Sequence, residues 1–157
     1  MMIGWFSLLL IGCLFVLLLA AGIQDARTRE IGNGKNAAIA LLAPLWWWSI
    51  GMPLWPAVGI QLVVAVVVFA VFCLAFSFGW MGGGDVKLIA ALALWLPAYS
   101  LVWMLAVMSL AGGVLTMVML ADHKIARRTG AVEVPYGVAI VVAALLTLRE
   151  PVLNPFQ

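Results

Sequence analysis

The chain has 157 residues, of which 67% are hydrophobic and 9% are charged, and its mean hydropathy is +1.22. Because an ordinary soluble domain carries roughly 25% charged residues, this composition excludes a soluble globular protein and predicts an integral membrane protein. The net charge of +2 is too small, and the basic residues too dispersed, to indicate a nucleic-acid partner. Cys13 and Cys73 lie in separate apolar stretches without C-x-x-C spacing, so neither a disulfide framework nor a zinc site is predicted.

The first long apolar segment covers residues 3–21, and two others of similar length cover residues 57–78 and 101–121. Each is near the length of about 20 residues that a membrane-spanning helix needs. The first could also be a secretory signal peptide, because Ala20-Ala21-Gly22 resembles a cleavage site. No Lys or Arg precedes it, however, so we favour a retained helix.

Three shorter apolar segments cover residues 37–50, 86–96 and 134–148. By length alone, segments of about 10 to 14 residues are ambiguous between spanning, re-entrant and buried helices. We expect an all-α fold: a polytopic membrane bundle of about six transmembrane helices, forming a single domain over residues 1–157.

Basic residues indicate how these helices are oriented. In a six-span arrangement only Arg149 falls on one side, and the positive-inside rule makes the other side cytoplasmic. Both termini are then expected on the outer, periplasmic side. The basic residues expected on the cytoplasmic side are Arg27, Arg29, Lys35, Lys87, Lys124, Arg127 and Arg128.

Tryptophan supports the same orientation, because only Trp80 falls near the inner ends of the predicted spans. The other seven fall near the outer ends: Trp5, Trp46, Trp47, Trp48, Trp55, Trp95 and Trp103. Tryptophan is enriched where a membrane meets water. We therefore interpret the run Trp46-Trp47-Trp48 as an interfacial anchor and not as a ligand-binding cluster.

Two aspartates stand at the edges of apolar segments on this cytoplasmic side. Asp25 is expected just past the end of the first span, and Asp85 at the start of the fourth. A carboxylate at membrane depth costs about 2.5 to 3.5 kcal/mol on insertion scales, so chemistry is a better explanation than stability. Up-and-down connectivity can bring the end of helix one beside the start of helix four. Two carboxyls in one site would share a proton, as in the aspartic proteases, without a metal or cofactor.

Three glycines, Gly82-Gly83-Gly84, precede Asp85. Without Cβ atoms, Gly82 and Gly84 let backbones approach closely and leave amide groups open to an extended substrate. The run matches neither a phosphate-binding loop nor a dinucleotide fingerprint. A flexible loop with a solvated aspartate is the alternative when the motif is taken alone.

Three motifs together resemble the type IV prepilin peptidases, which are intramembrane aspartic proteases. Residues 82–88 resemble the G-x-G-D-x-K signature, and residues 25–33 resemble an aspartate followed after five residues by Ile-Pro-Asn. Residues 134–140 resemble a carboxyl-terminal Pro-Tyr-Gly segment. The motifs occur in order over nearly the whole chain.

This resemblance implies an endopeptidase that removes the basic leader peptide of type IV prepilin or pseudopilin precursors, at the cytoplasmic face of the bacterial inner membrane. It implies Asp25 and Asp85 as the catalytic residues, with neither metal nor cofactor. The supporting or substrate-binding residues would be Gly82, Gly84, Lys87, Asn33, Pro135 and Tyr136. Lys87 either stabilises the ionised acid or extends to the lipid headgroups, which is the usual behaviour of such a lysine. The sequence does not determine the oligomeric state.

The chain departs from the family pattern at Gly32, where proline is usual. Glycine should loosen the turn that proline would stiffen. Larger members also carry a cytoplasmic insert with paired C-x-x-C zinc ligands, associated with methylation, which is not found here. The resemblance is thus to the short, peptidase-only branch that serves tight-adherence pili, and methyl transfer is not expected.

Two other classes of function could also use acidic residues in a membrane. A small proton-coupled transporter could use Asp25 and Asp85 as proton carriers. Both acids lie near one face, however, and no internal repeat relates the two halves of the chain. A non-enzymatic assembly subunit could instead pair the acids with basic residues of a partner helix.

Overall fold

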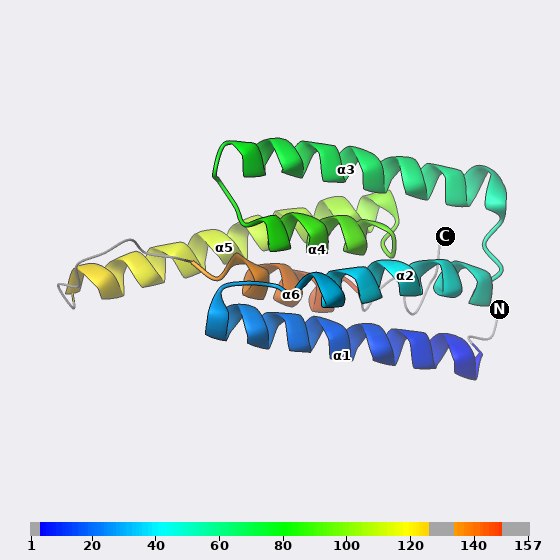
Figure 1. Cartoon of the computed structure of the whole chain (residues 1–157), viewed down its shortest axis with the longest axis horizontal. Helices are drawn as coiled ribbons and strands as arrows, with labels where there is room; N and C mark the ends of the chain where they lie inside the picture. The colour runs from blue at the N-terminus through cyan, green and yellow to red at the C-terminus, as the bar shows by residue number, and fades with distance from the viewer. Residues whose placement is uncertain (1–3, 126–133, 149–157) are drawn as a thin grey trace.

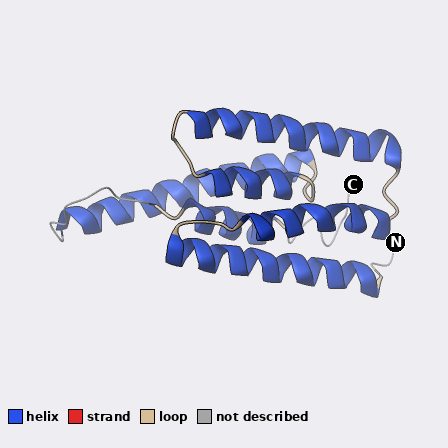
Figure 2. Cartoon of the chain, viewed as in Figure 1, coloured by secondary structure: helices blue, strands red, loops and turns tan. Residues whose placement is uncertain are grey.

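A computed structural model describes residues 4–125 and 134–148 of the chain. Within these ranges the fold is all-α, as predicted, with six α-helices and no strand (Figures 1 and 2). The helices are α1 (Trp5–Thr28), α2 (Asn33–Ser49), α3 (Gly59–Ser77), α4 (Gly83–Ala93), α5 (Ala98–Ile125) and α6 (Tyr136–Thr147), and the irregular segment η1 (Leu54–Val58) leads into α3.

Successive helices run in opposite directions, so the described part of the chain is an up-and-down bundle (Figure 1). The end of α1, the start of α2, the end of α3 and the start of α4 all lie at one end of the bundle. Beyond this end α5 projects alone. The described basic residues lie near this end, on the elements just named: Arg27, Arg29, Lys35, Lys87 and Lys124. The predicted positions of Arg127, Arg128 and Arg149 lie outside the described residues.

In the described part of the chain, three helical stretches are long and apolar enough to cross a membrane: Trp5–Thr28, Leu54–Ser77 and Ala98–Ile125. They correspond to the three long segments expected from the sequence. By contrast, α4 has 11 residues, which at about 1.5 Å per residue reach only about half of a hydrocarbon core of about 30 Å. Complete spanning by the three shorter helices therefore stays a prediction.

Side chains from other helices explain how α4 can end inside the protein. The buried Gln61 on α3 donates from Nε2 to the carbonyl oxygens of Ala93, at 2.7 Å, and Leu96, at 2.6 Å. Trp47 on α2 donates from Nε1 to the carbonyl oxygen of Leu94 at 2.9 Å. The last carbonyls of a helix lack partners within it, and at membrane depth they must find them in the protein. Gln61 and Trp47 supply those partners.

The core surrounds α4, which packs against α2, α3 and α6, while α6 also packs against α1 and α5. Fully buried leucine and isoleucine side chains fill the space between these helices, including Leu14, Leu18, Ile39, Leu88 and Leu92. Helix α4, which carries Asp85 in its first turn, is thus enclosed between neighbouring helices.

The interpretation of Trp46-Trp47-Trp48 as an interfacial anchor is wrong for two of the three residues. Trp46 and Trp47 are buried, whereas Trp48 is 77% exposed. Trp46 stacks on Trp95, with ring centroids 5.9 Å apart, and Trp95 donates from Nε1 to the carbonyl oxygen of Ile39. These tryptophans join α2 to the end of α4, because a buried indole gains both packing and a hydrogen bond there.

Candidate functional site

Asp25 and Asp85 line the same pocket, although 60 residues separate them in the sequence. The pocket has a volume of about 290 Å³ and is called the acidic pocket below. Its lining comes from the end of α1, the loop that follows it, and the start of α4: Asp25, Arg29, Glu30, Ile31, Gly82, Gly83, Gly84 and Asp85. Asp25 is 4% exposed and Asp85 is 8% exposed. Both acids are therefore nearly enclosed by protein.

Asp25 lies in the last turn of α1, and not past the end of the helix as the sequence suggested. The helix continues to Thr28 because no helix breaker intervenes, and it ends where Arg29 adopts a left-handed conformation with φ 56°. Helical backbone therefore fixes the direction of the Asp25 side chain.

The Asp25 carboxylate acts as a cap for α6. Its Oδ2 atom accepts a hydrogen bond of 3.0 Å from the backbone N–H of Val138, and the N–H of Gly137 also interacts with it. Pro135, which precedes α6, supplies no capping side chain. The first N–H groups of a helix need acceptors and favour negative charge. Burial disfavours a negative charge on Asp25, and these donors, together with the attraction of Arg29, offset part of that cost.

Asp85 is the third residue of α4, and its carboxyl interacts with the backbone N–H of Gly82, the residue before the helix. This contact is the returning half of a capping box, in which an acid in the first turn satisfies the preceding N–H group. The charge of Asp25 acts on Asp85 across the pocket. The two carboxyls are therefore electrostatically coupled.

Ile31, in the loop between α1 and α2, lies close to both α4 and α6. A Cβ atom placed on Gly84 would lie 3.1 Å from the Ile31 carbonyl oxygen, and one on Gly137 would lie 2.7 Å from Ile31 Cδ1. Two glycines thus allow Ile31 to fit between α4 and α6 beside both acids.

Gln24 holds the loop in which glycine replaces the family's usual proline. Its Oε1 atom accepts hydrogen bonds from the backbone N–H of Gly32, at 3.3 Å, and from the ammonium group of Lys35. Gly32 has a φ of −62°, which is the value that proline would impose. The loop thus keeps a proline-like backbone at this position.

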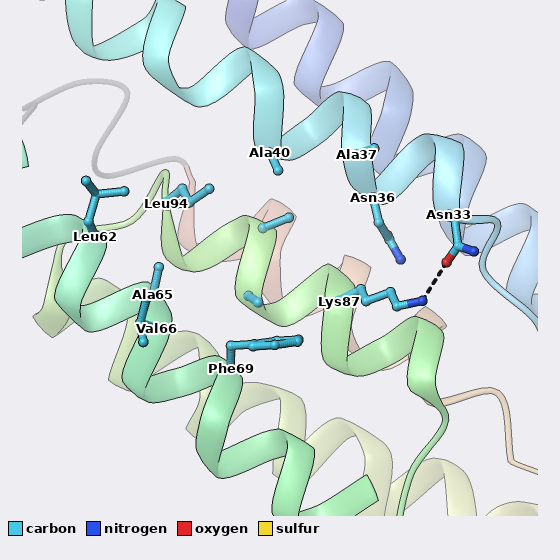
Figure 3. Close-up of a pocket in the computed structure, with 12 residues that line it drawn as sticks. Asn33, Asn36, Ala37, Ala40, Leu62, Ala65, Val66, Phe69, Lys87 and Leu94 are labelled. Carbon is cyan, nitrogen blue, oxygen red and sulfur yellow. Dashed lines mark hydrogen bonds between the residues drawn. The ribbon is translucent and has the colours of Figure 1, made fainter.

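The other predicted supporting residues divide between two places. Gly82 and Gly84 line the acidic pocket. Lys87 and Asn33 do not line it. Lys87 donates a hydrogen bond from Nζ to Asn33 Oδ1 at 2.7 Å, and both residues line an adjacent groove (Figure 3).

The remaining two predicted residues lie at the start of α6. Pro135 precedes the first turn. Tyr136 packs against Gly112 of α5, and its hydroxyl lies 3.4 Å from Thr116 Oγ1. Both lie where α6 begins, and neither lines the acidic pocket.

Sequence reasoning missed Ile31, Gly137 and Val138. The first two had a signal, because Ile31 lies in the first aspartate motif and Gly137 in the Pro-Tyr-Gly segment. Val138 contributes only its backbone N–H group, so its side chain gave no signal in the sequence. Among residues 4–125 and 134–148, no three His, Cys, Asp or Glu side chains converge in a way that could hold a metal ion.

Comparison with known families gives a match to the type IV leader peptidase family over residues 12–117. The chain belongs to the type IV leader peptidase family. The matched segment covers more than half of the chain and includes Asp25 and Asp85, but not the segment 134–140. Comparisons with curated proteins and with solved structures gave no match. Membership in this family, together with the long apolar helices, makes the chain a membrane-embedded peptidase that acts on prepilin-like substrates.

Proposed function

We propose that this leader peptidase is an aspartic endopeptidase whose catalytic residues are Asp25 and Asp85. The observation that carries the proposal is that these two buried carboxyls, from distant parts of the sequence, line one pocket and interact electrostatically. Two coupled carboxyls can hold one proton between them, which is the state from which aspartic proteases activate water.

The hydrogen-bond partners of the two acids support a division of roles. Asp25, which faces the N–H groups of Gly137 and Val138 and is attracted by Arg29, is proposed as the carboxylate that takes a proton from water. Asp85, which faces one N–H group and the charge of Asp25, is proposed to be protonated before the reaction and to give its proton to the oxygen of the scissile carbonyl.

In this scheme the water oxygen bonds to the scissile carbon, and the carbonyl oxygen takes the proton from Asp85. The carbon–nitrogen bond then breaks, and the proton that Asp25 accepted passes to the leaving amine. Asp85 recovers its proton as the carbonyl re-forms, so the pair returns to its starting state. The side chains thus move protons only, and every atom of the products comes from water and peptide.

The glycines at the pocket edge support binding of an extended peptide. Gly82 is exposed, Gly83 and Gly84 are half-buried, and none of them covers its backbone with a side chain. A peptide can approach such a backbone closely and form main-chain hydrogen bonds with it. We propose that the residues around the scissile bond lie along this segment.

The distribution of basic residues supports a cytoplasmic position for the acidic pocket. Arg27, Arg29 and Lys35 lie beside the pocket end of the bundle, and positive charge favours the cytoplasmic side. We propose that cleavage occurs there, at the bacterial inner membrane, and removes a basic leader peptide. We propose that the chain forms a single domain and belongs to the peptidase-only branch that serves tight-adherence pili. We also propose that it has no methyltransferase activity. The family match gives no support to the transporter hypothesis.

Coexpression with an epitope-tagged prepilin tests this proposal. The wild-type chain should produce a leader-sized mobility shift, and Asp25→Asn or Asp85→Asn should abolish it while the variant still accumulates in membranes. Asp122→Asn, near the exposed end of α5, is the matched control and should cleave normally. Full processing by either of the first two variants would refute the proposed roles.

A further inference from the structure

Asn36 is a buried amide on α2 that takes no part in the proposed reaction scheme. Its side chain is 4% exposed and lies between α2 and α4 (Figure 3). The Nδ2 atom donates a hydrogen bond of 3.0 Å to the carbonyl oxygen of Gly84. This carbonyl belongs to the peptide bond that joins Gly84 to Asp85. Asn36 therefore holds the backbone immediately before a proposed catalytic residue.

The hydrogen bonds of Asn36 are too few to explain its presence by stability. A carbonyl oxygen can only accept, so the amide nitrogen must face Gly84 and Oδ1 must point away. Oδ1 is buried and has no hydrogen-bond partner among the residues that the structure describes. An unpaired buried oxygen costs at least as much free energy as one neutral hydrogen bond contributes. The fold therefore gains little from this asparagine, which is typical of a residue kept for function.

The segment that carries Asn36 is also fastened to α1. Gln24, which precedes Asp25, accepts hydrogen bonds at Oε1 from the backbone N–H of Gly32 and from the ammonium group of Lys35. We call residues 31–36 the bracket. The bracket is tied on one side to the residue before the first acid. On the other side its last residue is tied to the residue before the second acid.

The bracket also contacts α4 through its first residue. Ile31 packs so closely against Gly84 that a Cβ atom on Gly84 would lie 3.2 Å from the Ile31 nitrogen. Gly84 is thus held by a backbone contact as well as by the Asn36 amide. Because α2 packs against both α1 and α4, the start of α2 connects the two helices that carry the acids.

We propose that Asn36 is a positioning residue, which fastens the bracket to α4 and thereby sets the spacing between the carboxyls of Asp25 and Asp85. This inference rests on the proposed function of the two acids. Asn36 does not line the acidic pocket, so it acts only through the peptide bond between Gly84 and Asp85. A misplacement of about 1 Å at a reacting group can cost roughly 10²-fold in rate, so a single bond at this place can matter.

Two substitutions give a matched test. Asn36→Leu removes the amide donor and the unpaired oxygen and keeps a side chain of similar size. In an α-helix a carbonyl oxygen accepts from the N–H group four residues later, so Gly84 keeps a partner within α4. Thr147→Val is the control, because Thr147 is also 4% exposed and donates to a helical carbonyl, that of Ala143, at the other end of α6 from the pocket.

The full chain is assayed in liposomes with an intact prepilin. Asn36→Leu should lower kcat roughly tenfold or more, because the acids are misaligned for reaction, and should leave KM within about twofold. Thr147→Val should match wild type in both constants. Wild-type kcat for Asn36→Leu would overturn the inference.

Thermal unfolding in detergent separates positioning from stability. Asn36→Leu should unfold within about 3 °C of wild type, because it removes an unpaired oxygen together with a hydrogen bond. Gln61→Leu, which removes a buried amide with two acceptors on the chain, should unfold at a lower temperature. An unfolding temperature for Asn36→Leu as low as that of Gln61→Leu would overturn the inference, since Asn36 would then serve the fold alone.

Cross-linking measures the spacing of the two acids without any cleavage. The test chain carries Asp25→Cys and Asp85→Cys, together with Cys13→Ser and Cys73→Ser, and a short bifunctional thiol reagent joins the two introduced thiols within one chain. Adding Asn36→Leu should lower the yield of this product several-fold, and adding the control substitution should not change it. An equal yield with and without Asn36→Leu would overturn the inference. If the wild-type chain does not cleave prepilin, the proposed function fails, and the cross-linking yield still decides the role of Asn36.

Discussion

Gly137 leaves no room for a side chain beside Asp25. A Cβ atom placed on Gly137 would lie 2.6 Å from Asp25 Cγ and 2.7 Å from Oδ2, closer than real Cβ contacts allow. The same residue offers its N–H group to the carboxylate. The absence of a side chain is therefore what permits α6 to bind Asp25 through its backbone.

Gly137→Ala should displace either the Asp25 carboxylate or the first turn of α6. Because a misplacement of about 1 Å at a reacting group can cost roughly 10²-fold in rate, we expect cleavage to fall by about that factor. The rate of prepilin cleavage in membranes measures it. Gly113→Ala on α5 meets no atom within 4 Å and should retain wild-type activity. Equal rates for the two variants would show that the Gly137–Asp25 contact does not matter.

Gly84→Ala should move the loop that carries Ile31. Its Cβ atom would lie 3.1 Å from the Ile31 carbonyl oxygen and 3.2 Å from the Ile31 nitrogen, and backbone atoms cannot move aside as a flexible side chain can. We expect a loss of about tenfold or more in cleavage rate. Gly34→Ala, in the first turn of α2 with open space around it, is the control. Activity of Gly84→Ala at the level of Gly34→Ala would contradict this role for Gly84.

Gly32→Pro should be nearly neutral. The φ of −62° suits proline, which would stabilise the fold by about 0.4–1 kcal/mol through the unfolded state. The substitution also removes the N–H group that bonds to Gln24, a loss of about 0.5–1.5 kcal/mol. We expect stability within about 1 kcal/mol of wild type and cleavage within about twofold. Thermal unfolding in detergent and cleavage assays measure both, and a large loss of activity would show that the Gln24 bond positions the loop.

Gln61→Leu should destabilise the end of α4. It leaves the carbonyl oxygens of Ala93 and Leu96 without their side-chain donor, at a cost of about 1–3 kcal/mol for each buried unsatisfied group. Trp47→Phe removes the donor to Leu94 and should have a smaller effect in the same direction. Trp48→Phe changes the exposed neighbour and should leave the unfolding temperature unchanged. Equal unfolding temperatures for all three variants would exclude this capping role.

The all-α fold, the six helices of the described residues and the convergence of the two aspartates were predicted from the sequence. Apolar segments, the placement of basic residues and up-and-down connectivity indicated the order of the helices, and that order allows the end of α1 to meet the start of α4. The position of Asp25 inside α1 was missed, since the apolar run ends at Ala21 while helical backbone continues to Thr28.

Features that depend on distant partners could not be predicted. Burial of Trp46 and Trp47 depends on Trp95 and Leu94, nearly 50 residues away. The sequence near the end of a span does not indicate whether protein or lipid covers a tryptophan there. The binding of Asp25 by Gly137 and Val138 uses backbone N–H groups, which every residue except proline carries. Only the packing of α6 against α1 selects these two.

The central claim is that Asp25 and Asp85 act together on one peptide bond, and initial rates with the purified full chain in liposomes test it most directly. Asp25→Asn and Asp85→Asn should each lower the cleavage rate roughly 10³-fold or more, and the double variant should be no slower than either, because residues that act as a unit are not additive. Asp122→Asn should match wild type. A single variant that retains wild-type cleavage, or a double variant much slower than both singles, would contradict the account.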